Sequence, residues 1–256
     1  MKELLVEYLI CPKCRKNFTL KAKKKVGNEI VEGELVCLKR HRFPISEGIP
    51  RLVVDKSKIF IKTENSFSAK WKNYNKTYHG KKWVGGQKKW FLERFGWNTI
   101  SNLNKFLKTR TRVLDAGTGV GNSAEMLAVN KSSIVFALDA SDSINFAYKK
   151  YRHLTNIHFI QADIRQLPFK KSFFNYIFSD QVLHHTKNTA TSFKYLTKFL
   201  IKHGFISIYV YNRKAPIREY VDDYIRQRTI KMTVAECTEF SKDMAYLGKA
   251  LSKLLQ

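Results

Sequence analysis

A glycine-rich segment near the middle of the 256-residue chain limits its fold more than any other feature. Residues 113–122 read Val-Leu-Asp-Ala-Gly-Thr-Gly-Val-Gly-Asn, an apolar run that ends in Asp115 and continues through Gly117, Gly119 and Gly121. Glycine permits a tight turn and lets the backbone approach a ligand closely. The segment is predicted to join a strand to a helix, whose free N–H groups suit a carboxylate.

Strand-like and helical patterns alternate between residues 106 and 212. The sequence predicts strands at 112–115, 133–139, 157–162, 176–179 and 205–211. It predicts helices after a cap at Asn122 or Ser123, from Ser141 to about Tyr151, and over 191–202, ended by Gly204. Such alternation is typical of an α/β fold with a mostly parallel sheet and helices on both faces.

Two acidic residues end the second and third predicted strands. Asp139 follows Gly121 by 18 residues, a position from which a carboxylate accepts hydrogen bonds from both ribose hydroxyls. Asp163 can accept from an adenine amino group, with Ile164 against the ring. Asn122 breaks the Gly-x-Gly-x-x-Gly pattern, so the fingerprint for a dinucleotide pyrophosphate is absent.

These segments resemble the class I S-adenosylmethionine-dependent methyltransferases, in particular the broad type 11 group, over about residues 106–210. The resemblance rests on the glycine segment, Asp139, Asp163-Ile164 and the run Phe174-Asn-Tyr-Ile-Phe-Ser-Asp-Gln-Val-Leu-His-His185. It implies a Rossmann-like domain and methyl transfer to an unidentified acceptor. It also implies that Asp115 and Gly117 to Gly121 hold the methionine part of the cofactor, Asp139 the ribose and Asp163 the adenine.

Methyl transfer needs little side-chain chemistry, because the protein must mainly align the acceptor and exclude water. A base helps only where the acceptor loses a proton. Asp180 and His184 follow the fourth predicted strand and are the candidate bases; alternatively, His184 and His185 only line the pocket or cap a helix. The Asn/Asp-Pro-Pro-Tyr/Phe motif of amino-group methyltransferases is absent, which argues against methylation of adenine or a glutamine amide.

A second motif lies at the N-terminus, where Cys11-x-x-Cys14 and Cys37-x-x-x-His41 flank a predicted hairpin. Its strands are expected at 17–22 and 30–36, joined by Lys23–Glu29 with the turn at Gly27-Asn28. Two such Cys/His pairs make a tetrahedral Cys3His zinc site. A unit of residues 1–55 is marginal without such a staple.

The N-terminal segment resembles the zinc ribbons fused to many bacterial and archaeal methyltransferases. It is also similar to the small zinc-ribbon activator of tRNA and release-factor methyltransferases, which implies a protein partner as one role. Those ribbons commonly end in a fourth cysteine, whereas this chain offers His41, so a metal-free ribbon stays open as the alternative.

Residues 56–105 are basic and aromatic, with all four tryptophans at Trp71, Trp83, Trp90 and Trp97. One interpretation is an RNA-binding segment that tracks phosphates and stacks bases. The other is a lid, because Phe67–Trp71 resembles the stretch that precedes the catalytic domain in type 11 relatives. Helices are expected here with a break near Gly85-Gly86.

Residues 213–256 are predicted to form a helical tail, with Pro216 in a first turn and a capping box at Thr233–Glu236. Class I methyltransferases usually end in an antiparallel hairpin instead. The predicted organisation is therefore a ribbon at 1–55, a lid or linker at 56–105, a cofactor domain at 106–212 and the tail.

The charge is strongly unbalanced, with 47 Lys+Arg against 21 Asp+Glu and a formal net charge of +26. Such a field favours polyanions, RNA among them. No apolar run reaches the roughly 20 residues of a membrane span, and no signal-peptide pattern is present, so a cytoplasmic protein is expected. The rivals of a methyltransferase are an RNA-binding protein or an adaptor with a vestigial cofactor fold.

Overall fold

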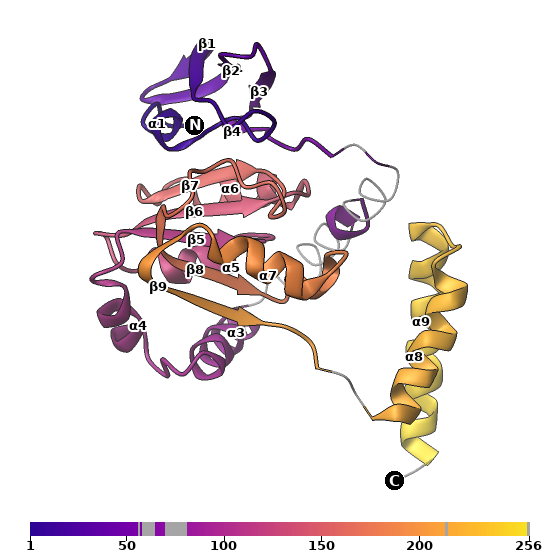
Figure 1. Cartoon of the computed structure of the whole chain (residues 1–256). Helices are drawn as coiled ribbons and strands as arrows, with labels where there is room; N and C mark the ends of the chain where they lie inside the picture. The colour runs from indigo at the N-terminus through magenta and orange to yellow at the C-terminus, as the bar shows by residue number, and fades with distance from the viewer. Residues whose placement is uncertain (56, 58–64, 70–80, 213–214, 255–256) are drawn as a thin grey trace. The chain divides into compact units, whose positions relative to one another are not determined.

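The computed structural model describes residues 1–55, 57, 65–69, 81–212 and 215–254. The chain divides into two compact units, Met1–Val210 and Tyr211–Gln256. Figure 1 shows a small antiparallel sheet and a larger parallel sheet in the first unit, and two helices in the second. The α/β class and the helical tail expected from the sequence are both confirmed.

Five parallel strands form the larger sheet in the order β7-β6-β5-β8-β9. In chain order they are β5 (Arg112–Ala116), β6 (Ile134–Asp139), β7 (Ile157–Gln161), β8 (Phe174–Asp180) and β9 (Leu200–Tyr209). The first strand is central, and the direction of winding reverses between β5 and β8. Open α/β sheets bind ligands at such a switch point, outside the carboxyl ends of the strands.

Helices cover one face of this sheet almost completely. The apolar core on that face joins alternate strand residues to side chains of α3 (Lys81–Arg94), α4 (Ile100–Leu107), α5 (Asn122–Leu127) and α6 (Ser143–Tyr151). On the other face, α7 (Thr189–Thr197) packs beside β8 and β9. No helix stands between β7 and β8, so the part of this face over β6 and β7 needs another cover.

The N-terminal ribbon supplies that cover. It consists of α1 (Leu5–Tyr8), β1 (Phe18–Val26), β2 (Glu29–Cys37), β3 (Arg42–Ser46) and β4 (Ile49–Pro50). The ring of Tyr8 lies 5.4 Å from that of Phe136 on β6 and 5.7 Å from that of Phe173. The backbone N–H of Leu52 donates to the carbonyl of Gln161 at 2.7 Å. Ribbon and parallel sheet therefore share one core.

The boundaries of two elements differ from the predictions. The strand β1 continues to Val26, so the hairpin connection is only the turn at Gly27-Asn28. The helix α7 ends at Thr197, and residues 200–204 belong to β9, so Gly204 does not end the helix. The carbonyl of Phe199 accepts from the N–H groups of both Phe173 and Phe174, and this sheet pairing overrides the helical spacing.

Two other local predictions are wrong. The helix α5 begins after Gly121, and the hydroxyl of Ser123 donates to Asp115 instead of capping the helix with Asn122. The helix α3 runs without a break through Gly85 and Gly86. The expected Ser141 cap is closer: its hydroxyl accepts from the N–H of Ser143, the first residue of α6.

The second unit holds α8 (Pro216–Thr229) and α9 (Val234–Leu254). Pro216 occupies the first turn of α8, as predicted. The capping box is also confirmed, because Thr233 N–H donates to Glu236 and Glu236 N–H donates back to the Thr233 hydroxyl. Across the described parts of the chain, no helix has the length and apolar character needed to cross a bilayer.

Candidate active site and metal cluster

The glycine segment forms the loop between β5 and α5. Gly117, Gly119 and Gly121 adopt φ values of +91°, +55° and +86°, in the region that favours glycine. The N–H of Gly117 donates to Leu138 at 2.8 Å, which ties the loop to the end of β6. A Cβ on Gly117 would lie 2.3 Å from the side chain of Val182, which follows β8. The loops after β5, β6 and β8 therefore meet at the switch point.

Asp139 lies at the end of β6, where its carboxylate faces the glycine loop. It accepts from the N–H of Gly119 at 2.8 Å and from the N–H and hydroxyl of Ser141 at 2.9 and 2.6 Å. A carboxylate offers about four acceptor positions, so this conformation leaves one for a ribose hydroxyl. Contact with both ribose hydroxyls would require one of these three donors to give way.

Asp115 is buried at the end of β5, with 1% of its surface exposed. The hydroxyl of Ser123 donates to it at 2.7 Å. Burial raises the pKa of Asp115 to about 7, and the nearby charges of Asp180 and Asp139 act in the same direction. A cationic group placed beside this carboxylate would favour its ionised form.

We expect Asp115→Asn to stabilise the cofactor-free protein at alkaline pH. Since the folded pKa is raised from 3.8 to about 7, Asp115 contributes stability below about pH 4 that is lost as the pH rises to about 7. At about 1.4 kcal/mol per pKa unit, the loss reaches a few kcal/mol. Urea unfolding at pH 5 and pH 8 measures it, with Asp142→Asn as the surface control. An equal pH dependence in Asp115→Asn and wild type would contradict the assignment.

Asp163, beyond the end of β7, is held by an arginine that the sequence analysis did not single out. Arg165 donates to it through the backbone N–H at 2.8 Å and through Nε and Nη2 at 2.5–3.0 Å. The same guanidinium donates to Asp55 of the ribbon segment at 3.0 Å. The neighbouring side chain of Ile164 is buried, at 7% exposure. An adenine amine would have to share Asp163 with Arg165.

Asp180 ends β8 and forms an ion pair with a second unpredicted arginine. Arg94 Nη1 lies 2.6 Å from its carboxylate, and both side chains are largely buried. The guanidinium lies over the rings of Trp90 and Tyr209. Burial raises the pKa of Asp180, and the charge of Arg94 opposes this shift. The signal that could have revealed Arg94 is its place among aromatic residues on an otherwise lysine-rich helix.

The second candidate base, His184, lies in the short helix Leu183–His185 after β8. It is half-buried, and its ring centroid is 4.1 Å from that of exposed His185. The ring of Phe67 lies 4.9 Å from His185, so the Phe67 segment approaches this end of the sheet. Asp180 and His184 thus share the carboxyl end of β8, as predicted, while their roles remain predictions.

The basic aromatic segment is only partly described. Trp97 is buried among aromatic rings, 5.6 Å from those of Phe91 and Phe95, whereas half of Trp90 is exposed. These contacts are those of a helix packed on the sheet. Trp71 and the side chain of Trp83 lie outside the described residues.

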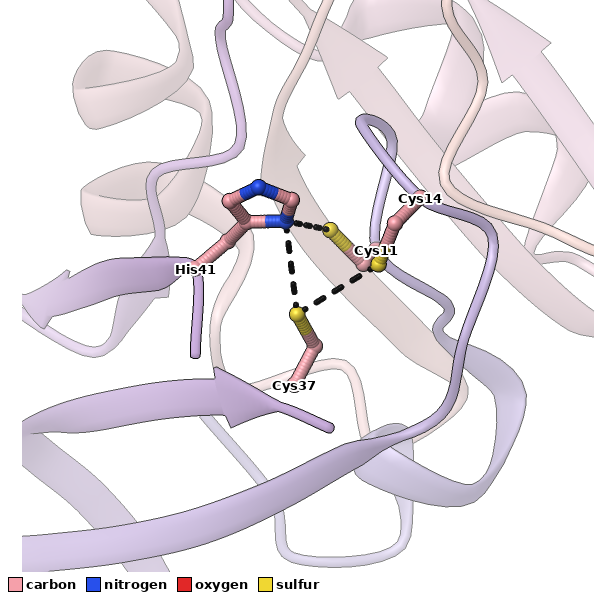
Figure 2. Close-up of side chains that lie close together, drawn as sticks. All are labelled: Cys11, Cys14, Cys37 and His41. Atoms are coloured by element: carbon pink, nitrogen blue, oxygen red, sulfur yellow. Dashed lines mark hydrogen bonds between the residues drawn. The ribbon is translucent and has the colours of Figure 1, made fainter. Parts of the chain in front are cut away.

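The four predicted metal ligands come together in the ribbon (Figure 2). Their ligand atoms all lie within 4.8 Å of one another. The Nδ1 atom of His41 is 3.5 Å from the sulfur of Cys11 and 3.4 Å from that of Cys37, and the sulfurs of Cys14 and Cys37 are 3.5 Å apart. Tetrahedral zinc with bonds of about 2.0–2.3 Å spaces its ligands at about 3.5–3.8 Å. The cluster therefore fits a zinc ion, with His41 as the fourth donor.

The strand order, the three left-handed glycines and the carboxylates at the strand ends define an α/β domain for a nucleoside-bearing cofactor. The Cys/His cluster defines a zinc-ribbon-like domain in front of it. Comparison with known families gives the narrower class. Residues 114–208 match the family described as a methyltransferase domain (Methyltransf_11), and residues 2–48 match the family described as Trm112p-like protein. The chain carries an S-adenosylmethionine-dependent methyltransferase domain behind a Trm112p-like ribbon.

Individual proteins resemble the chain more weakly. The ubiquinone/menaquinone biosynthesis C-methyltransferase UbiE of Coxiella burnetii is 25% identical over 136 residues, which are 50% of this chain and 54% of that protein. The chain thus spans about half the length of the curated relatives it matches. A methyltransferase from Aquifex aeolicus is 18% identical, with 53% and 80% of the two chains covered and a TM-score of 0.39. The PH0226 protein from Pyrococcus horikoshii is 19% identical, with 67% and 70% covered and a TM-score of 0.43.

Proposed function

We propose that this chain transfers the methyl group of S-adenosylmethionine to a small-molecule acceptor. The observation that carries the proposal is the convergence of the glycine loop with Asp139 at the switch point of the sheet. Loop and carboxylate together fit a ligand with an amino-acid end and a ribose. In this proposal the ribbon (1–55), the lid (56–105) and the cofactor domain (106–212) act as one catalytic unit.

The proposed cofactor contacts follow from the side chains at the strand ends. Asp115 and Gly117, Gly119 and Gly121 would hold the methionine part, and Asp139 would accept from the ribose. Asp163, shared with Arg165, and buried Ile164 would flank the adenine. The bound cofactor supplies an activated methyl group on a sulfonium. The protein's own part is to align the acceptor and keep water away.

The proposed acceptor side is the carboxyl end of β8. Asp180 and His184 are close enough along the chain to act on the same acceptor, and one of them would take its proton where the reaction requires a base. The Arg94–Asp180 pair, with Trp90 and Tyr209 around the guanidinium, offers an aromatic wall and a charged edge. Such a lining suits a flat acceptor with an acidic hydroxyl or carboxylate.

The acceptor class separates two versions of the proposal. UbiE, a relative of this chain, is by its name a C-methyltransferase of quinone biosynthesis, and the aromatic lining is consistent with a ring acceptor. The net charge of +26 supports RNA instead. Incubation of cell extract with the protein and cofactor labelled in the methyl group distinguishes them. Label in the organic extract supports the small molecule, and label in RNA overturns it.

For the ribbon, we propose a structural zinc ion held by Cys11, Cys14, Cys37 and His41. Its donor set and spacing fit the metal. The ribbon already packs on the bare face over β6 and β7, so its first protein partner is the domain behind it. A metal-stabilised cover of this kind supports an enzyme more directly than an adaptor that awaits a separate partner.

Calorimetric titration of the purified protein with S-adenosylmethionine tests the proposed function. We expect micromolar affinity, and we expect Asp139→Ala to weaken it at least 100-fold, because the substitution removes both the ribose contact and the tie to Gly119. Asp243→Ala, an exposed change in α9, is the matched control and should bind as wild type does. No heat of binding at millimolar cofactor would refute the enzyme.

A further inference from the structure

The two helices of the second unit have no apolar core of their own. No residue of α8 is buried, and every described residue from 215 to 254 is at least partly exposed. A unit of residues 211–256 is too short to be stable as a lone pair of helices without disulfides, metal or a partner. The helix pair therefore needs a surface to pack against.

Each helix presents an apolar stripe. On α8 the exposed residues Ile217, Tyr220, Val221 and Tyr224 recur at intervals of three and four, and so lie on one face. On α9 the same spacing joins Phe240, Met244, Leu247 and Leu251.

The stripe of α8 points away from the side that faces α9. The least exposed positions of α8 are Glu219, Asp222, Ile225 and Thr229, and these lie on the opposite side of the helix from Ile217 and Tyr224. Ile217 is 81% exposed and Tyr220 is 74% exposed. The pairing of α8 with α9 thus leaves most of the apolar surface uncovered.

We propose that α8 and α9 form a self-association surface, on which a second copy of this chain packs its own two helices to make a four-helix assembly. With roughly half of each large side chain exposed, the eight stripe residues offer on the order of 700 Å² per copy, close to the ~800 Å² that each partner buries in a stable interface. A twofold dimer needs such a self-complementary face.

The composition of the two units favours a second copy over other occupants. In the described part of the first unit, exposed large apolar side chains are scattered over distant segments, for example Leu4, Leu38, Ile100 and Phe205, and offer no matching stripe. An anionic lipid surface fits less well, because α8 carries Glu219, Asp222 and Asp223 between its apolar residues.

Sedimentation equilibrium of the full chain at micromolar concentration tests the proposal. We expect twice the chain mass of 29.9 kDa. The variant Leu247→Lys/Leu251→Lys places two charges on the stripe of α9 and should shift the protein to monomer, with at least a 30-fold higher dissociation constant. The matched control Ala245→Lys/Ser252→Lys adds the same charges on the other side of α9 and should stay dimeric.

Three outcomes would overturn the self-association surface. A monomeric wild type would do so, whether or not it floats with phosphatidylglycerol vesicles. A dimer that survives the stripe variant would place the interface elsewhere. Equal dissociation by the control variant would show a general charge effect. Circular dichroism confirms that each variant keeps its helices, and the cofactor titration, measured separately, distinguishes this proposal from the proposed enzymatic function.

Discussion

Exchange of Cys11 for serine is expected to remove bound zinc and to lower the Tm of the protein by roughly 10 °C or more. Cys11 is fully buried and is one of four ligands that the ribbon brings within 4.8 Å of one another. A structural zinc site contributes several kcal/mol to folding. In a domain of about 200 residues, each kcal/mol corresponds to about 2–4 °C in Tm.

The effect should spread beyond the ribbon, because ribbon and parallel sheet share one core. Tyr8 packs on Phe136, Ile10 N–H donates to Pro168, and Leu52 N–H donates to Gln161. Loss of the ribbon would expose the face over β6 and β7 to water. It would also release Arg51, which donates to Gln161 and to Asn145 of α6. We therefore expect Cys11→Ser to weaken cofactor binding as well.

Cys237→Ser is the matched control, since Cys237 lies in α9 outside the metal cluster. Metal analysis should find one zinc per chain in the wild type and in this control, and none in Cys11→Ser. Thermal unfolding with and without a chelator completes the test. A wild type that is purified without zinc and is unaffected by chelator would establish the metal-free ribbon.

The sequence was a good guide wherever one local pattern determines the structure. The glycine segment, the Cys/His pairs and the Thr233–Glu236 capping box all form as predicted, because each depends on residues a few positions apart or on a covalently fixed spacing. The alternation of apolar runs also predicted the strand order well enough to place Asp139 beside the glycine loop.

The rest depends on contacts between distant segments. Arg165 and Arg94 hold the two carboxylates that sequence reasoning assigned to the cofactor and the acceptor, and neither arginine belongs to a motif. The early start of β9 follows from the pairing of Phe199 with the strand before it. That the ribbon covers a sheet face lacking a helix can be seen only once both sheets are in place.

Gly117→Ala is expected to destabilise the protein by about 2–5 kcal/mol and to abolish cofactor binding. The φ of +91° at Gly117 is unfavourable for alanine, at a cost of about 1–2 kcal/mol. The new Cβ would lie 2.3 and 2.6 Å from the two Cγ atoms of Val182, and such overpacking adds about 1–3 kcal/mol. The loop after β5 or the segment leading to His184 must then move.

Gly86→Ala separates this effect from the general cost of replacing a glycine. Gly86 lies within α3 and has no heavy atom within 4 Å of the added Cβ, so alanine there should leave the protein unchanged or slightly more stable. Adding Val182→Ala to Gly117→Ala should recover the packing part of the loss but not the backbone part. Urea unfolding and cofactor titration of the four proteins measure both parts. If Gly117→Ala behaves like Gly86→Ala, the glycine loop does not have the close contact with the β8 loop on which the proposed site depends.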